Sequence, residues 1–290
     1  RLESPQVDLR PGPDGRLNLL RAFAPPGPPP EEEPEEAGAP PVNIRVDELA
    51  LADGRFNYAA PSGDGAEEKT DRITLQGIGL DGRNLNLAER RGTVELTVDG
   101  GEVGMAGVAT TLEKLALNVG LEGDRIAPLP LEIQAAGPTL AVSGSVDDLS
   151  GTPTLEGTLD LSADLAAVAR LAGLETELSG PVTVNLTASG TAGTPKADLT
   201  VAYGGGILAG TPMDSLELRA SLSDRQLTLS RLTAAGPAAD LDLTGSADLT
   251  NAFADGLIAA PTDLSALTYQ AKIDEAVVRF AELLPKNGMG

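Results

Sequence analysis

Hydrophobic and polar residues alternate one by one along much of the chain, most regularly in its second half. Val182, Val184 and Leu186, for example, are separated by single threonine or asparagine residues. A period of two places successive side chains on opposite faces of a β-strand. The pattern therefore predicts amphipathic strands with one apolar and one polar face each.

Short breaks rich in glycine, proline or Asp-Gly separate these segments and are expected to be turns. They are Asp53-Gly54, Asp81-Gly82, Asp99-Gly100-Gly101, Glu122-Gly123-Asp124, Gly137-Pro138, Ser143-Gly144 and Gly204-Gly205-Gly206. Short connections between amphipathic strands are typical of an antiparallel meander. The predicted fold class is all-β, mainly an antiparallel meander with one or two short helices. We expect an elongated, curved sheet, with a closed β-sandwich as the alternative.

Two segments have a helical pattern instead. Ser162 is a suitable N-cap for a helix over 163–172, with Gly173 as its stop. Asp274 is a suitable N-cap for a second helix over 275–284, which Pro285 would end.

A weak internal repeat suggests how the chain is organised, because Ser143–Leu149 resembles Thr244–Leu249. The expected parts follow from this repeat and from the composition. They are an N-terminal strand pair at 1–23, a Pro- and Glu-rich loop or linker at 24–41, a first strand repeat at 42–161, a helix with a second repeat at 162–274, and a C-terminal helix beginning a further repeat at 275–290.

Composition excludes several functions. The chain has 43 Asp+Glu against 21 Lys+Arg, a formal charge of −22, which repels the phosphates of nucleic acids. It has no cysteine and no histidine, which excludes Cys or His zinc sites and the Ser-His-Asp and Cys-His nucleophile arrangements. There are 4 Phe, 3 Tyr and no Trp, which favours a thin structure over a thick core.

Acidic residues are the remaining candidates for chemistry. Asp147-Asp148 and Asp99-Gly100-Gly101-Glu102 do not have the spacing of a calcium loop, so we interpret them as solvated turn acids. A carboxylate pair acting as a glycosidase is the enzymatic alternative, but the aromatic platforms for sugars are nearly absent. We expect no enzyme, no cofactor and no metal.

No apolar run reaches the roughly 18 residues that a membrane-spanning helix needs. The chain begins abruptly at Arg1, and we expect any membrane anchor to lie outside these residues.

Three stretches resemble the AsmA/TamB family of repeating β-groove proteins. They are Ser4-Pro5-Gln6-Val7-Asp8-Leu9 with Asp14-Gly15-Arg16-Leu17-Asn18-Leu19, the hairpin-like Ile44–Tyr58, and the stretch 159–203 with its Gly190-Thr191 and Pro195. The resemblance implies a β-sheet folded into a trough with an apolar inner face. It also implies a periplasmic location, an inner-membrane anchor, and a role in moving phospholipid to the outer membrane or in assembling outer-membrane proteins.

Phospholipid is the expected partner, because an apolar strand face shields acyl chains without any catalytic group. The residues predicted to face this groove are Val182, Val184, Leu186, Leu199, Val201, Leu216, Leu218, Leu227, Leu229, Leu241 and Leu243. The alternative function is a scaffold for outer-membrane proteins that binds a client strand at a sheet edge near 199–209.

Overall fold

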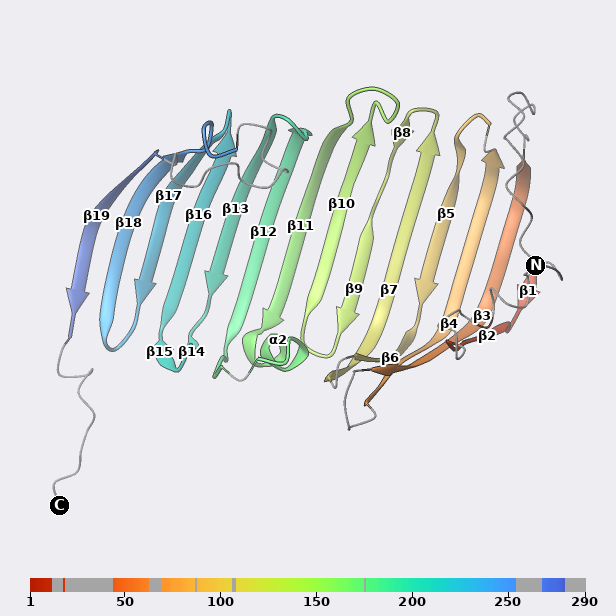
Figure 1. The fold of residues 1–290 in the computed structure, drawn as a ribbon, viewed down its shortest axis with the longest axis horizontal. Helices are drawn as coiled ribbons and strands as arrows, with labels where there is room; N and C mark the ends of the chain where they lie inside the picture. The colour runs from red at the N-terminus through yellow and green to blue at the C-terminus, as the bar shows by residue number, and fades with distance from the viewer. Residues whose placement is uncertain are drawn as a thin grey trace, which may run out of the picture. The chain divides into compact units, whose positions relative to one another are not determined.

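A computed structural model describes residues 1–11, 18, 44–62, 69–86, 88–105, 108–174, 176–253 and 268–279. The predicted linker at 24–41 lies outside them. The described residues are mainly strand, which confirms the all-β class, and nearly all strand pairs are antiparallel (Figure 1). They divide into two compact units, Arg1–Gly123 and Asp124–Gly290.

Unit 1 is a sheet that begins with two short strands. Its elements are β1 (Leu2–Glu3), β2 (Gln6–Leu9), β3 (Arg45–Ser62), β4 (Lys69–Asn86), β5 (Arg91–Val98), β6 (Gly100–Met105) and β7 (Val108–Glu122). β1 and β2 both pair with β3 in parallel. The predicted N-terminal strand pair at 1–23 stays a prediction, because most of its second half lies outside the described residues. Asn18, which is described, donates its backbone amide to the Arg10 carbonyl at 2.9 Å.

The Asp-Gly pairs of unit 1 are not turns. β3 runs through Asp53-Gly54 and β4 runs through Asp81-Gly82. β5 and β6 are separated by Asp99 alone, and both pair with β4 on one side and β7 on the other. Three predicted turns are thus wrong, and a stretch from 91 to 105 crosses the sheet as one interrupted strand.

The β3–β4 pair has two neighbouring β-bulges, one at Asp53-Gly54 on β3 and one at Gly77 on β4. Leu51 pairs with Leu80 before the irregularity, and Phe56 pairs with Leu75 after it. Asp53 has φ 53° at this point of β3, and Gly77 has φ 61° on β4. A side chain at Gly77 would meet the Asp99 carboxylate, since an added Cβ would lie 2.5 Å from Asp99 Oδ2. An extra residue on each strand keeps apolar residues on one face although their sequence spacing changes.

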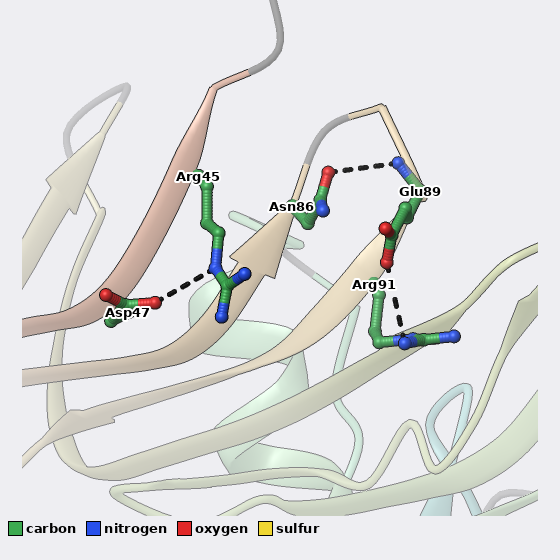
Figure 2. Close-up of polar contacts among 5 residues, drawn as sticks. All are labelled: Arg45, Asp47, Asn86, Glu89 and Arg91. Atoms are coloured by element: carbon green, nitrogen blue, oxygen red, sulfur yellow. Dashed lines mark hydrogen bonds and ion pairs between the residues drawn. The ribbon is translucent and has the colours of Figure 1, made fainter.

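Charged residues of unit 1 pair with neighbours two positions away in the sequence. Figure 2 shows Arg45 with Asp47 at 3.1 Å and Arg91 with Glu89 at 3.5 Å. In the same view the Glu89 amide donates to Asn86 Oδ1 at 3.1 Å. These pairs are exposed, so each contributes only about 0–1 kcal/mol to stability. They leave the two arginines partly neutralised rather than gathered into a basic patch.

Unit 2 is an antiparallel sheet with a small hairpin and a helix. Its elements are β8 (Arg125–Ile126), β9 (Leu131–Ala135), β10 (Thr139–Asp147), β11 (Thr154–Asp164), α2 (Leu165–Leu171), β12 (Pro181–Thr191), β13 (Pro195–Tyr203), β14 (Gly206–Leu208), β15 (Thr211–Met213), β16 (Ser215–Ser223), β17 (Gln226–Ala235), β18 (Ala239–Asp248) and β19 (Thr268–Val278).

Two predicted breaks in unit 2 are turns and one is not. The Gly137-Pro138 turn joins β9 to β10, with the Ala135 amide donating to the Pro138 carbonyl at 2.9 Å. Gly204 and Gly205 lie between β13 and β14, and Gly206 is the first residue of β14. Ser143-Gly144, in contrast, lies inside β10, so the turn predicted there is wrong.

The predicted helix at 163–172 is present in shortened form as α2. Its N-cap is Asp164 rather than Ser162, and the Asp164 carboxylate accepts a hydrogen bond from the Ala166 amide at 2.8 Å. Gly173 follows the helix with φ 63°, as expected of a helix stop. Because β11 and β12 pair directly along their length, α2 does not interrupt the sheet.

The second predicted helix is wrong over its described part. Residues 268–278 form β19, which pairs with β18, and residues 280–290 lie outside the described part of the chain. The register shifts where Leu243 pairs with Ile273 and Asp242 pairs with Glu275, which leaves Asp274 as an extra residue. This bulge gives the apolar positions Ile273 and Ala276 a spacing of three, which resembles a helical period.

The interior is thin. Among the described residues of unit 2, the buried apolar side chains are Ala163, Ala167, Ala169, Tyr203 and Ala252, and none of the large side chains is fully buried. Apart from the β14–β15 hairpin, the described strands of unit 2 belong to one sheet. The closed β-sandwich alternative is therefore not the arrangement seen in this unit.

Candidate functional site

The predicted groove residues all lie on one face of the unit 2 sheet. Residues directly opposite each other on antiparallel strands share a face. Val184 pairs with Val201, which in turn pairs with Leu218. The same cross-strand links connect the other predicted residues, which we call together the apolar face. Apart from Leu227, which is 39% exposed, these predicted side chains are half-buried.

One row of large aliphatic side chains crosses nine successive strands, β9, β10, β11, β12, β13, β16, β17, β18 and β19 (Figure 1). This central row is Ile133, Leu140, Leu161, Val184, Val201, Leu218, Leu232, Leu243 and Ile273. Nine strands make eight steps of about 4.8 Å, so the row is about 38 Å long. That length exceeds the hydrocarbon core of a bilayer, which is about 30 Å thick.

Two bulges keep this face apolar. On β17, Leu218 pairs with Leu232 but Ala220 pairs with Leu229, so Ser230 is the extra residue. In a regular strand of the same sequence, without this bulge, Leu229 and Leu232 would lie on opposite faces because they are three positions apart. The bulge at Asp274 has the same effect on β19. The continuity of the apolar face therefore depends on backbone irregularities as well as on alternation.

A second row on this face has the smallest side chains of the sheet. It passes through Gly144, Gly157, Ala188 and Ala197 on β10 to β13. An open cavity of about 590 Å³ lies over the same four strands. Its larger lining side chains, including Ser143, Thr158 and Thr187, belong to the opposite face, so the cavity lies on the polar face of these strands.

A network of buried and half-buried groups closes one end of the apolar face, where α2 and the β14–β15 hairpin lie (Figure 1). Tyr203 is 4% exposed, and its hydroxyl donates to the Ser179 carbonyl at 2.8 Å. The Ser179 hydroxyl accepts from the Ile207 amide at 3.0 Å, and the Ser179 amide donates to the Ile207 carbonyl at 2.9 Å. A Cβ at Gly206 would lie 2.8 Å from the Tyr203 hydroxyl, so the glycine is needed for this contact.

Burial raises the pKa of Tyr203 above its ordinary value of 10.0, and the negative charge of Asp164 adds to the rise. The phenol is therefore neutral at physiological pH and serves as a hydrogen-bond donor. The α2 side of this end is equally close-packed, since a Cβ at Gly137 would lie 2.5 Å from that of Ala167.

The opposite face carries hydrogen-bonding and charged side chains. Ser143 and Thr158 share a hydrogen bond of 2.8 Å across β10 and β11, and Asn185 donates to Asp160 across β11 and β12. Arg219 lies 2.6 Å from Glu217 on the same strand. This arrangement is what alternation predicts for a solvated strand face.

The acids considered for calcium have structural partners. Asp147 pairs with Arg125 at 2.8 Å, and Asp148 accepts from the Thr152 amide at 2.9 Å to fix a turn. The described part of the chain contains no group of three or more Asp or Glu that could hold a metal ion. In that same part no helix is both long and apolar enough to cross a bilayer.

Sequence reasoning missed several residues of the apolar face. Leu140, Leu161 and Leu232 lie in the central row, and Tyr203 closes its end. Alternation identified the first two as strand residues, and extending the predicted face to β9–β11 would have included them. Leu232 is out of phase with Leu229, and only the bulge places them together.

The predicted client-binding edge near 199–209 is wrong. β13 pairs with β12 on one side and with β16 on the other, so its edges are occupied. Residues 206–208 form β14, which pairs with β15.

Comparison with family models, curated proteins and solved structures finds no match for this chain. Function is therefore inferred from the residues and their arrangement.

Proposed function

We propose that unit 2 binds phospholipid acyl chains on its apolar face and shields them from water during transfer between membranes. The observation that supports this is the central row, an uninterrupted line of aliphatic side chains across nine strands. Ordinary soluble sheets cover such a face with a second layer, whereas here the row is half-exposed within the described residues.

The chemistry of the face suits an acyl chain. Leucine, valine and isoleucine give an apolar surface without hydrogen-bonding groups, so no position on it fixes a headgroup. Each methylene removed from water contributes about 0.8 kcal/mol, so even partial cover of an acyl chain is strongly favourable.

The resemblance to the AsmA/TamB family extends this proposal to the cell envelope. We propose that the chain is a periplasmic segment of an inner-membrane-anchored protein that carries phospholipid between the inner and outer membranes. The absence of histidine and cysteine agrees with a carrier that performs no chemistry on its cargo.

Two adjacent residues of β12 provide a matched test. Val184 lies in the central row, and Thr183 lies on the polar face of the same strand. Val184→Asp places a carboxylate among the acyl chains, whereas Thr183→Asp adds the same charge to the solvated face. Phospholipid transfer between donor and acceptor vesicles of phosphatidylethanolamine and phosphatidylglycerol measures the effect, and circular dichroism checks that both variants fold.

We expect Val184→Asp to reduce the transfer rate at least about tenfold, because burying a carboxylate beside an acyl chain costs more than 1.4 kcal/mol. Thr183→Asp should transfer lipid at the original rate. Equal rates of phospholipid transfer by the two folded variants would contradict the proposal. So would purified protein that shows no bound phospholipid in native mass spectrometry.

The alternative function, a scaffold for outer-membrane proteins, has one supporting observation. β19 is paired only with β18 among the described strands, so its other edge is open to an added strand. Specific crosslinking of an outer-membrane protein strand to β19, together with a lack of lipid transfer, would favour this alternative.

A further inference from the structure

A wall of backbone and small side chains borders the apolar face at one end of its strands. It consists of α2, residues 178–180 and the β14–β15 hairpin, which we call together the end wall (Figure 1). A Cβ added at Gly137, in the β9–β10 turn, would lie 2.5 Å from the Ala167 Cβ of α2. A Cβ added at Gly236, in the β17–β18 turn, would lie 3.1 Å from the Pro212 carbonyl oxygen of β15. The end wall therefore reaches from the β9–β10 turn to the β17–β18 turn.

The end wall lies over the apolar face of the sheet and leaves the polar face uncovered. Ala163 and Tyr203, on the apolar face, are 5% and 4% exposed. Their neighbours Ser162 and Ala202, which point to the polar face at the same level of the sheet, are exposed. Adjacent residues of one strand differ in this way because only one side is covered. A ligand that lies along the strands on the apolar face must therefore stop at the end wall.

Polar groups of the end wall are already hydrogen-bonded within the protein. Besides the bonds between Tyr203, Ser179 and Ile207, the Leu165 amide donates to the Gly180 carbonyl at 2.9 Å. A phosphate placed here would have to displace these bonds, and the negative charge of Asp164, which acts on Tyr203, would repel it. The end wall thus favours an apolar chain end over a headgroup.

The apolar face becomes more exposed toward the opposite end of the strands. On β11, Ala163 is 5% exposed beside the end wall, whereas Leu155, eight positions away on the same face, is 46% exposed. Eight residues of strand span about 27 Å. The acyl chains of one bilayer leaflet occupy about 15 Å, half of the hydrocarbon core. The face therefore holds a whole acyl chain along the strands, with its ester-linked end on the more exposed side.

We infer that phospholipid binds the apolar face in one orientation, with its acyl-chain ends against the end wall and its headgroup toward the opposite strand ends. This inference rests on the proposed lipid function, and it restricts the ligands to lipids whose chain ends are apolar. Because the chains lie along the strands, a lipid moves from strand to strand without turning round. Successive headgroups then lie along the same border of unit 2.

Depth-dependent quenching of a fluorophore tests this orientation, and the lack of cysteine allows a single labelling site. Val182→Cys places the label beside the end wall, because Val182 pairs with Ala163, and Leu155→Cys places it at the opposite end of the face. Each labelled full chain is mixed with a phosphatidylethanolamine that carries a nitroxide either at the end of an acyl chain or beside its ester bond. Circular dichroism checks that both labelled chains fold.

The chain-end nitroxide should quench the Val182→Cys label more than the Leu155→Cys label, and the ester-side nitroxide should do the reverse. Equal quenching of each label by the two lipids, or the opposite preference, would overturn the orientation while leaving lipid binding in place. If neither lipid quenches either label, the proposed function fails together with the orientation.

The original chain, without any substitution, provides a second test. It is incubated with equal amounts of two phosphatidylethanolamines of the same chain length, one with methyl chain ends and one with a carboxylate at a chain end, and the bound lipid is identified by native mass spectrometry. The methyl-ended lipid should exceed the other at least about tenfold, because a carboxylate against the end wall loses its hydration. Equal occupancy would overturn the orientation, since it would place the chain ends in water.

Discussion

Deletion of Thr228 should move a leucine of β17 from one face of the sheet to the other, whereas deletion of Ser230 should not. Ser230 is the extra residue of the β17 bulge and makes one side-chain hydrogen bond, from its hydroxyl to the Arg219 carbonyl at 3.2 Å. Without Ser230, Leu229 and Leu232 are two positions apart, so strict alternation keeps both on the apolar face. Without Thr228, Leu227 and Leu229 are adjacent in the sequence, so one of them must turn to the polar face.

The cost of the Thr228 deletion follows from the burial of the displaced leucine. Leu227 is 39% exposed and Leu229 is half-buried. Full burial of a leucine contributes about 1.5–3 kcal/mol, so one partly covered leucine represents about 1 kcal/mol.

Urea unfolding monitored by circular dichroism measures this effect. With a slope of about 2 kcal/mol per molar urea, the midpoint of the Thr228 deletion should lie about 0.5 M below that of the Ser230 deletion. The Ser230 deletion is the matched control, because it shortens the same strand by one residue without moving a leucine to the other face. If the two deletions have the same midpoint, alternation does not set the phase of the apolar face.

Two further substitutions test the close contacts of each unit. Gly77→Ala should lower the free energy of unfolding by about 3 kcal/mol, because it combines a left-handed backbone with a clash against Asp99. Gly123→Ala is the control, because Gly123 has φ 63° and nothing lies within 4 Å of the added Cβ. It should lower the free energy of unfolding by about 1 kcal/mol. Tyr203→Phe should cost about 1 kcal/mol at neutral pH through the lost hydrogen bond to Ser179. Because the pKa of Tyr203 is raised in the folded state, the stabilisation from its protonated phenol is complete below pH 10.0 and is lost as the pH rises through the folded pKa. Above pH 10.0 the melting temperature of Tyr203→Phe should therefore fall less steeply with pH than that of the original chain. A Gly77→Ala variant as stable as Gly123→Ala, or identical alkaline slopes for the tyrosine pair, would show that these contacts are not formed.

Alternation was sufficient to predict the regular strands of unit 2, such as β12 and β13, and the face that each of their residues takes. Val182, Val184 and Leu186 on β12 share a face because period two is a property of the extended backbone itself. The turn at Gly137-Pro138 was also predicted from its residues, since both favour a break in the strand.

Asp-Gly was a misleading signal in unit 1. Asp53 has a positive φ, and a positive φ occurs both in a turn that reverses the chain and in a β-bulge that only adds a residue to the strand. Local sequence does not distinguish the two, because the difference lies in whether the neighbouring strand continues past the site. Long strands such as β3 and β4 are therefore divided too often by sequence reasoning.

The same limitation explains the C-terminal error. Ile273 and Ala276 are three apart, which resembles one turn of a helix, but the bulge at Asp274 gives a strand that spacing. The open edge of β19 was equally hidden, because it depends on which strands pair rather than on the composition of any one strand.

Photocrosslinking with a lipid tests most directly whether acyl chains contact the central row. A phosphatidylethanolamine with a photoreactive group at the end of its acyl chain is supplied in vesicles to the full chain, and the adducts are located by peptide mass spectrometry. The account predicts adducts on Val184, Val201 and Leu218, with Thr183 and Arg219 of the polar face unmodified. Adducts spread equally over both faces, or confined to the polar face, would contradict it.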